Sequence, residues 1–393
     1  MLEDGPGIAN FGLCCGGNGN TAGIQYRLGT SSSPASYPSN PALKLTLTAN
    51  GFPAGCCVEV YGVQPNLKIP SSDLFSLEVQ RDLGHAMTAT IGYAGAVGHH
   101  YARLVNQNFL YNNANTPVFA AYFAQTDSGA AYNSLNVQLR RPMRNNISYS
   151  FVYTYAKSLD QVSNGDYADG AANQTNPAFN NTEWGPSDYD MKHRVVATGL
   201  YQSPKIHTGN AIGDALVNGF QINGTWTWHT GLPWTPVTTN LNTVPFQNGA
   251  ATQNVVRPVG YNGQALNSCS NSAFTSGSNF PNRTSGSLNV GGANYFTQIL
   301  PPTGGYKPGI GRNSFRGPCY QDVDMSVAKE FAFDLGEHHD LFRIQANIYN
   351  VFNQLQLQPL GNGNGNNINS QFFGYSQGGD SGRNIELLAR IQF

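Results

Sequence analysis

Two clusters of histidine and carboxylate residues are the first places where this sequence could do chemistry. His99 and His100 are adjacent, and Glu337-His338-His339-Asp340 sets two imidazoles between two carboxylates. Imidazole and carboxylate groups are common metal ligands. Adjacent side chains on a strand point to opposite faces, however, and both clusters lie at expected strand ends or turns. We therefore interpret them as solvated turn residues, and we expect no metal site and no cofactor.

A second candidate is Gly379-Asp380-Ser381-Gly382, which resembles the nucleophile loop of chymotrypsin-like proteases. In those enzymes a histidine activates the serine and an oxyanion hole lies beside it. Here Arg383 stands where that family has a second glycine, and no histidine segment of that family is present. Gly and Asp favour a turn before the last strand instead. We therefore expect no catalytic residue and no enzyme, and a soluble β-sandwich hydrolase is the least favoured of three hypotheses.

Aromatic and phosphate-binding motifs give no better candidate. Trp226, Trp228 and Trp234 could stack on a sugar or a cofactor, but at alternating spacing we expect them in the aromatic belt of a membrane interface. No Gly-x-Gly-x-x-Gly leads a strand into a helix, and no Walker loop is present. The net charge of −1 also argues against nucleic acid as a partner, because phosphate binding needs a basic patch.

The six cysteines include two adjacent pairs, Cys14-Cys15 and Cys56-Cys57, together with Cys269 and Cys319. Neighbouring cysteines in Gly-rich polar loops suit an oxidising compartment. The two pairs could cross-link to each other, and Cys269 to Cys319, although the sequence does not fix the connectivity. A zinc site is the less favoured alternative, because it requires Cys-x-x-Cys spacing and a nearby ligand set.

The composition favours strands and an unusual surface. The 393 residues include 45 Gly and 22 Pro, which indicate many turns, and only 11% are charged. With 20 Tyr and 21 Phe, the surface is neutral-polar and aromatic, which suits a wall with lipid outside and water inside. No run of about eighteen apolar residues is present, so a transmembrane helix is excluded and only a closed β-barrel could span a bilayer.

The last residues carry the clearest strand pattern. Ile385, Leu387, Ala389, Ile391 and Phe393 fall on one face, whereas the other face is polar except for Leu388. About ten residues is the length that a tilted strand needs to cross a bilayer. The pattern therefore fits a membrane strand that ends on an aromatic carboxy-terminus.

The same alternation recurs along the chain and predicts ten strands. Four hairpins pair 74–81 with 87–93, 132–140 with 147–155, 193–201 with 220–228, and 322–331 with 342–349, and 43–49 is one further run. Short turns alternate with long segments near 98–131, 159–192, 236–320 and 354–383, the third of which could hide further strands. Outer-membrane barrels have short periplasmic turns and long extracellular loops. We predict an all-β, antiparallel portion of a transmembrane β-barrel in the outer membrane of a Gram-negative-type bacterium.

Several motifs point to a family through their order and spacing over roughly residues 60 to 393. They are Tyr61-Gly-Val-Gln-Pro-Asn-Leu-Lys68, Glu78-Val-Gln-Arg81, Gly92-Tyr-Ala-Gly95, Tyr132-Asn-Ser-Leu135, Tyr153-Thr-Tyr-Ala-Lys-Ser-Leu-Asp160, Asp190-Met-Lys-His-Arg194, Thr230-Gly-Leu-Pro233, Gly311-Arg-Asn-Ser-Phe-Arg-Gly-Pro318 and Asn347-Ile-Tyr-Asn-Val-Phe-Asn353. With these motifs the chain resembles the carboxy-terminal barrel portion of a TonB-dependent receptor of the Oar-like group.

The resemblance implies a large barrel occluded by a plug, with energy delivered by TonB. No plug domain, TonB box or regulatory-like domain is found in this sequence, and its amino-terminus does not have the pattern of a secretory signal. We therefore expect the chain to be the carboxy-terminal piece of something longer, or a truncated gene model. Residues 1–60 form a loop-rich segment that could hold one strand, and 61–393 form the carboxy-terminal part of the barrel.

The expected function is solute uptake or ligand capture without catalysis; the alternative is a surface adhesion or structural barrel whose Asn/Gly-rich loops bind a matrix or partner cell. The expected partners are outer-membrane lipid, the barrel-assembly machinery, TonB through amino-terminal parts only, and an unidentified ligand. The assembly machinery would read the strand that ends at Phe393. Asp188-Tyr-Asp190 and His193-Arg194 would pair charges at the rim or lumen. The residues expected to line the lumen are Glu78, Gln80, Asn136, Gln138, Arg343, Gln345 and Asn347.

Overall fold

The computed structural model describes only part of the chain. It covers residues 11–14, 24–26, 57–106, 118–163, 180–237, 257, 260–261, 269–275, 289–290, 293–294, 296–297, 310–335, 338–358, 360, 365–366, 368, 372–376 and 378–392. Within these residues, no helix is long and apolar enough to cross a membrane.

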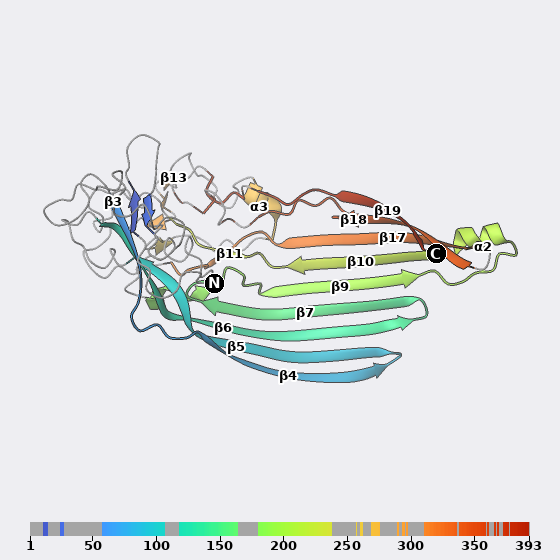
Figure 1. Ribbon diagram of the computed structural model, residues 1–393, viewed down its shortest axis with the longest axis horizontal. Coiled ribbons are helices and arrows are strands. Elements are labelled where there is room, and N and C mark those ends of the chain that lie inside the picture. The colour runs from blue at the N-terminus through green and yellow to red at the C-terminus, as the bar shows by residue number, and fades with distance from the viewer. Residues whose placement is uncertain are drawn as a thin grey trace, which may run out of the picture.

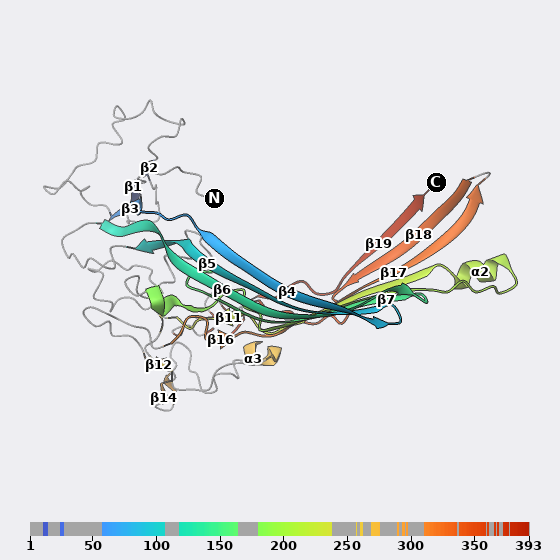
Figure 2. The same ribbon diagram turned by 90° about the horizontal axis from the view of Figure 1, so that it is seen from below.

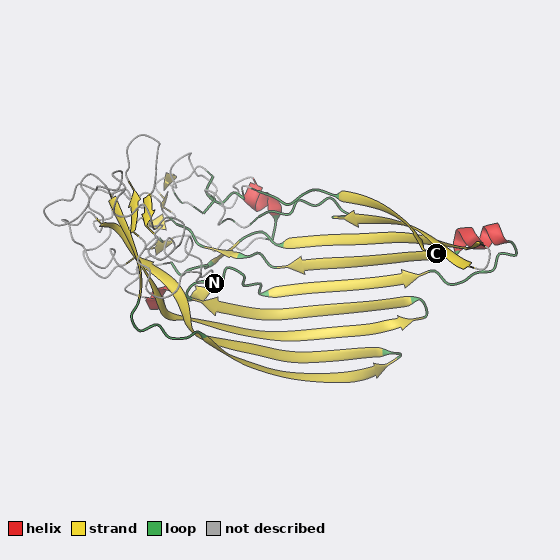
Figure 3. Ribbon diagram, viewed as in Figure 1, coloured by secondary structure: helices red, strands yellow, loops and turns green. Residues whose placement is uncertain are grey.

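Nine long strands of the described chain form one antiparallel sheet in which each strand pairs with its neighbour in sequence (Figures 1 and 3). They are β4 (Ser71–Gly84), β5 (Met87–Asn106), β6 (Val118–Arg144), β7 (Ile147–Asp160), β9 (His193–Gln202), β10 (Phe220–His229), β17 (Tyr320–Leu335), β18 (His338–Tyr349) and β19 (Asn384–Gln392). All nine were predicted from alternation, and the all-β antiparallel fold class is confirmed. The expected strand at 43–49 lies outside the described residues.

Shorter elements cluster at one end of the long strands, which we call the loop side. They are β1 (Phe11–Cys14), β2 (Ile24–Tyr26), β3 (Cys57–Val63), η4 (Asn180–Glu183), β8 (Gly185–Pro186), β11 (Pro233–Trp234), β12 (Gly260–Tyr261), α3 (Asn271–Thr275), β13 (Asn289–Val290), β14 (Ala293–Asn294), β15 (Phe296–Thr297) and β16 (Phe315–Arg316). The segment 236–320 therefore holds short strands, as the sequence allowed.

The prediction of a long loop at 98–131 is wrong, because residues 98–106 belong to β5 and residues 118–131 belong to β6. β5 and β6 stay paired as far as Asn106 and Tyr122, and β3 then pairs with β6 in parallel. Arg103 is buried there and donates to both carboxylate oxygens of Asp127, from Nε at 2.5 Å and from Nη2 at 2.6 Å. Such a two-point ion pair fixes a polar stretch of ladder that the apolar alternation could not signal.

Cross-strand register puts apolar side chains on one face of the sheet and polar side chains on the other. One row across six strands consists of Val79, Ile91, Val137, Tyr153, Val195 and Trp228. The adjacent row contains Gln80, Thr90, Gln138, Val152, Val196, Thr227 and Asp322. We call these the apolar face and the polar face, since successive side chains of a strand alternate between them.

The apolar stretch is staggered from strand to strand. The apolar stretch begins, on the loop side, at Phe75 in β4 and at Ile385 in β19. Followed across the sheet to β6, the row of Phe75 arrives at Asn133 and the row of Ile385 arrives at Arg141, eight residues further along. A shift of eight residues, at a rise of about 3.3 Å per residue, accumulates over eight inter-strand spacings of about 4.8 Å. This ratio corresponds to a tilt of about 35° between the strands and a barrel axis, at the lower end of the usual range. Figure 2 shows β17, β18 and β19 bending away from the plane of β4 to β7, so the sheet is both staggered and curved.

Two of the connections opposite the loop side are tight turns. His85 and Ala86 join β4 to β5 with φ of 55° and 61°, and Asn145 and Asn146 join β6 to β7 with φ of 52° and 65°. Two consecutive positive φ angles are the signature of a type I′ hairpin turn, whose twist matches that of the flanking strands. These turns fix the two hairpins that the sequence predicted.

The connection between β9 and β10 is not the short turn that we expected. It contains the helix α2 (Ala211–Val217), which begins after Asn210, whose side chain accepts a hydrogen bond from the backbone N–H of Gly213 at 2.6 Å. An asparagine at this position satisfies an N–H group that the helix leaves free. The apolar alternation of the flanking strands carries no information about such a cap, which is why the helix was missed.

Asp214 holds the start of this connection through Thr208. The backbone N–H of Thr208 donates to Asp214 Oδ1 at 2.5 Å, and its hydroxyl donates to the same atom at 2.9 Å. The backbone bond first, and then the hydroxyl bond, lower the pKa of Asp214 below its ordinary value of 3.8. Because the folded pKa is the lower one, the stabilisation is present above 3.8 and is lost as the pH falls through the folded pKa.

We expect the protection factor of the Thr208 amide against hydrogen exchange to be constant above the ordinary pKa of Asp214 and to fall at lower pH. Asp214→Asn should weaken the protection above the ordinary pKa of Asp214 and remove the acid step, because the amide oxygen is neutral at every pH. An unchanged acid step in Asp214→Asn would assign the titration to another group.

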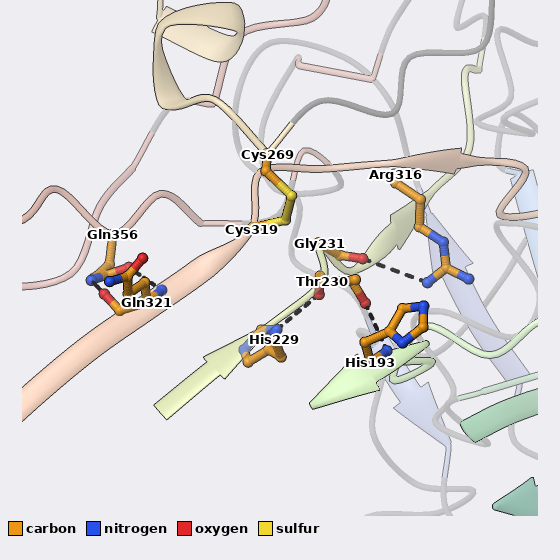
Figure 4. The surroundings of a disulfide bond; sticks show 9 residues. All are labelled: His193, His229, Thr230, Gly231, Cys269, Arg316, Cys319, Gln321 and Gln356. Atoms are coloured by element: carbon orange, nitrogen blue, oxygen red, sulfur yellow. Dashed lines mark hydrogen bonds between the residues drawn. A yellow bond between two sulfur atoms is a disulfide. The ribbon is translucent and has the colours of Figure 1, made fainter. Parts of the chain in front are cut away.

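The loop side has its own core, and a disulfide lies beside it. Cys269, just before α3, is bonded to Cys319, just before β17 (Figure 4), a pairing that the sequence allowed. Trp234 is only 2% exposed, so the prediction that it belongs to a membrane-interface belt is wrong. It packs on Phe315 and Phe373, with ring centroids 5.3 and 5.7 Å apart. The paired cysteines at 14–15 and 56–57 lie outside the residues whose side chains are described.

Candidate functional site

All seven residues predicted to line a lumen share the polar face. Glu78 lies opposite Gly92, and Gly92 lies opposite Asn136. Two residues further along each strand, Gln80 and Gln138 occupy the next polar row. At the other end of the sheet, the cross-strand row of Asn347 runs through Ser326, Asn223 and Leu200 to Ser148 on β7. Ser148 is an even number of residues from Thr154, the partner of Asn136, so both lie on the polar face. Arg343 and Gln345 alternate with Asn347 on β18 and so lie on the polar face too.

The three members of this set on β18 are hydrogen-bonded in a row, and Arg343 also pairs with Glu330 of β17. Arg343 donates from Nη1 to Glu330 Oε1 at 3.0 Å and from Nε to Gln345 Oε1 at 3.1 Å. Gln345 in turn donates from Nε2 to Asn347 Oδ1 at 2.6 Å. This run of four side chains orders the polar face and holds one ion pair among amides. On β6 and β7, Thr154 donates to Asn136 Oδ1 at 2.8 Å in the same way.

Two shallow grooves lie along polar-face residues and meet at Asn223. One has a volume of about 240 Å³ and crosses β10, β17 and β18; the other has about 310 Å³ and crosses β6, β7, β9 and β10. The polar-face residues that line them are Arg140, Ser148, Ser150, Thr198, Leu200, Asn223, Thr225, Asp324, Ser326, Gln345, Asn347 and Tyr349. Hydroxyl and amide groups dominate, so this surface can exchange hydrogen bonds with a polar solute along most of its length.

The opposite face exposes large apolar side chains over most of the sheet. Leu77, Ile91, Ile344 and Leu387 are among them, and Leu387 is 79% exposed. A continuous apolar patch across nine strands is far larger than those on soluble monomers, and lipid is the solvent that it fits. Trp226 and Trp228 occupy the loop-side end of the apolar stretch of β10, and their place in an interfacial belt stays a prediction.

A cluster of ion pairs closes the loop-side end of β7. Arg312 contacts Asp160 through a buried ion pair, donates from Nη1 to Ser163 Oγ at 3.2 Å and lies 3.4 Å from Asp188 Oδ1. Arg316 pairs with the buried Asp190, which also accepts the backbone N–H of Ser158 at 2.6 Å. We call Arg312, Arg316, Asp160, Asp188 and Asp190 the rim cluster.

Four motifs that carried the family resemblance meet at the rim cluster. The segment 153–160 provides Asp160, 190–194 provides Asp190, and 311–318 provides both arginines. The segment 230–233 completes the group, because β11 pairs with β16 and a Cβ on Gly231 would lie 1.8 Å from a backbone oxygen of Gly317. Glycine is required at this approach. Figure 4 shows Arg316 pointing toward Gly231 from the neighbouring strand.

Asp188 and Asp190 do pair charges, but with Arg312 and Arg316 and not with His193 and Arg194, so the predicted grouping is wrong in its partners. Neither Arg312 nor Arg316 was predicted as a site residue, although two arginines within a Gly- and Pro-flanked motif stand out in a chain with 21 Lys and Arg. His193 lies on the apolar face and contacts aromatic rings: its Nδ1 is 2.8 Å from the hydroxyl of Tyr153.

The remaining sequence candidates have ordinary surroundings. The interpretation of the two histidine clusters as solvated turn residues is wrong, because the strands extend further than the alternation indicated: His99 and His100 lie within β5, and His338, His339 and the buried Asp340 begin β18. His99 Nε2 lies 3.5 Å from Asp73 Oδ2 of β4. Ser381 is exposed just before β19, and the backbone N–H of Asp380 donates to the carbonyl of Gln356 at 2.8 Å, which belongs to an antiparallel bridge between Leu357 and Gly379 and not to a turn. Among the described residues, no group of three or more His, Cys, Asp or Glu could hold a metal ion. Phe393 and Glu337 lie outside the described residues.

A staggered antiparallel sheet with one polar face and one exposed apolar face is the wall of a membrane β-barrel. The chain belongs to the outer membrane beta barrel domain family, whose model matches residues 11–386. It is therefore a protein of the cell outer membrane. None of the curated proteins matches the chain.

Three solved structures give a measure of similarity. The outer membrane transporter YddB from Escherichia coli is 12% identical, with a TM-score of 0.44 over 83% of this chain and 33% of YddB. Pyoverdine-bound FpvA from P. aeruginosa is 9% identical, with a TM-score of 0.38 over 83% of this chain and 27% of FpvA. The FrpB iron transporter from Neisseria meningitidis is 9% identical, with a TM-score of 0.34 over 76% of this chain and 29% of FrpB. The chain thus spans about a third or less of each.

Proposed function

We propose that the chain is part of the barrel wall of an Oar-like TonB-dependent receptor, and that it takes part in solute uptake or ligand capture without catalysis. The observation that carries the proposal is the shared polar face of the seven residues named as lumen-lining, opposite an apolar face that lipid covers. In this function Glu78, Gln80, Asn136, Gln138, Arg343, Gln345 and Asn347 line the lumen and set which solute is tolerated.

Further partners belong to the same proposal. Phe393 ends the strand that the barrel-assembly machinery would read during insertion. TonB would act through parts of the receptor outside this sequence, because the motifs that resemble the family all fall in its barrel portion. The rim cluster also supports the proposed membership of this receptor group, since it joins four of the family-like motifs in one place.

Solute depletion from the growth medium tests the uptake function. Cells that carry the chain should deplete its solute from the medium. A strain that lacks the chain, and a strain that lacks TonB, should both leave that solute in the medium. Uptake that is lost without the chain but persists without TonB would contradict the proposal.

A matched pair of variants on β18 ties the loss to the polar face. Gln345→Leu should change which solutes are depleted, because it breaks the run from Arg343 to Asn347. The neighbouring Ala346→Leu, on the apolar face, should leave depletion unchanged. Equal effects of the two variants would separate uptake from this face.

A further inference from the structure

The connection that contains α2 exposes apolar side chains beyond the end of the strands. Ile212 is 76% exposed, Leu216 is 63% exposed, and Ile206 is also exposed. Ile212 and Leu216 are four residues apart and so lie on one side of the helix. Figure 1 shows α2 on the side of the sheet opposite the loops, where the tight turns of the hairpins also lie. In an outer-membrane barrel that end is periplasmic.

Hydrogen bonds within the connection hold these side chains in place. Asn218 accepts the backbone N–H of Ile206 at 2.7 Å and donates its own side-chain N–H to the carbonyl of Ile206 at 2.8 Å. Asp214 binds Thr208, and Asn210 caps the helix. The exposed isoleucines and leucine therefore belong to an ordered segment whose apolar groups have no cover within the described chain.

Lys329 locates the end of α2 on the apolar face. Lys329 lies opposite Phe220 in an apolar row. Its Nζ is 4.2 Å from the centroid of the Phe220 ring and 5.1 Å from that of the Phe331 ring. The same Nζ donates to the carbonyl of Leu216 at 3.3 Å and to that of Asn218. A lysine that binds the last carbonyls of a helix complements the negative end of the helix dipole. Since Lys329 belongs to the lipid side, the carboxy-terminal end of α2 lies there as well.

We propose that the segment 206–218 is an interfacial anchor that inserts Ile212 and Leu216 among the phospholipids of the periplasmic leaflet. The apolar surface of Phe220, Ile222 and Ile344 continues directly into it, so the anchor extends an interface that the fold already has. Lys205, which is exposed and adjacent to Ile206, adds a basic residue to the edge where phosphate groups of the lipids lie, and Lys329 holds the helix end at that edge. An apolar surface with a basic rim fits a phospholipid leaflet better than a soluble partner.

Photolabelling from lipid tests the anchor without any substitution. Cells that produce the chain are fed a fatty acid carrying a diazirine, which enters their phospholipids, and isolated outer membranes are irradiated. The peptide that contains 206–217 should carry label at a level comparable to that of the β19 peptide, whose side chains face lipid. Trp184, an exposed aromatic residue beside Gly129 on the loop side, serves as the control and should carry little label.

Two results would overturn the proposal. Label on 206–217 no higher than on the Trp184 peptide, with β19 labelled normally, would place α2 in water. Protection of 206–217 from both the lipid label and hydroxyl radicals would mean that a protein, or a second copy of this chain, covers it. The double variant Ile212→Ser and Leu216→Ser gives a further check: it should lose the label on 206–217 and keep it on β19.

Discussion

Replacing Arg312 by methionine should destabilise the loop side by about 3–5 kcal/mol, the usual cost of removing one partner of a buried ion pair. Arg312 is nearly buried and faces the equally buried Asp160. It also donates to the carbonyl of Glu183 from Nε at 2.9 Å and to that of Asp160 from Nη2 at 2.6 Å. Methionine fills similar space but leaves the Asp160 carboxylate without its counter-charge, with only the Ser163 hydroxyl as a donor at 3.0 Å, and removes the Arg312 donor from both carbonyls.

The measurement is the urea dependence of proteolytic cleavage within the loop side of the folded protein. Arg383→Met is the matched control, because Arg383 is an exposed arginine on the same side, and its replacement should change the unfolding free energy by no more than about 0.5 kcal/mol. The double variant Arg312→Met with Asp160→Leu should recover part of the loss, since it removes both charges. A shift for Arg312→Met as small as that for Arg383→Met would mean that the rim cluster adds no stability.

The membrane-spanning strands could be predicted because the bilayer imposes a strict rule on them. Each must alternate apolar and polar side chains over about ten residues, and this pattern is visible in one sequence. The shared face of Ile385, Leu387, Ala389 and Ile391 was therefore predicted correctly. The rule stops at the membrane surface. β5 and β6 continue beyond it through ladder hydrogen bonds and the Arg103–Asp127 pair, and no periodic signal marks them.

The loop side could not be predicted for a different reason. Its contacts join residues far apart in the chain, such as Arg312 with Asp160 and Trp234 with Phe373. Local spacing contains no trace of such pairings. Trp234 shows the consequence, because it follows the alternating strand β10 and was assigned to the same belt as Trp226. Its position after Pro233 instead carries it into the loop-side core.

The candidate lumen wall could be predicted in part. Alternation fixed which residues share a face, so all seven were grouped correctly on the polar side. The hydrogen bonds between them depend on which strands are neighbours, and that order came from the hairpin turns and the register. Arg343 was therefore predictable as a polar-face residue, whereas its ion pair with Glu330 was predictable only once β17 and β18 were paired.

Val137→Arg should cost about 2–4 kcal/mol of unfolding free energy, and Gln138→Arg should cost little, because an arginine on the lipid face near the midplane of a bilayer loses its hydration. Val137 lies at the centre of the apolar stretch of β6, between Ile91 and Tyr153 on the neighbouring strands. Neither neighbour offers a counter-charge. Gln138 is the next residue on the same strand and lies opposite Thr90 on the polar face.

Urea unfolding of the two variants in phospholipid vesicles measures the difference between the faces. Adjacent positions on one strand share depth, pairing and strand propensity, so the comparison isolates what covers each face. A large loss for Val137→Arg alone would establish lipid on the apolar face and water on the polar face, as a lumen requires. Equal losses would mean that both faces are covered by apolar material, and a larger loss for Gln138→Arg would reverse the assignment of the lumen.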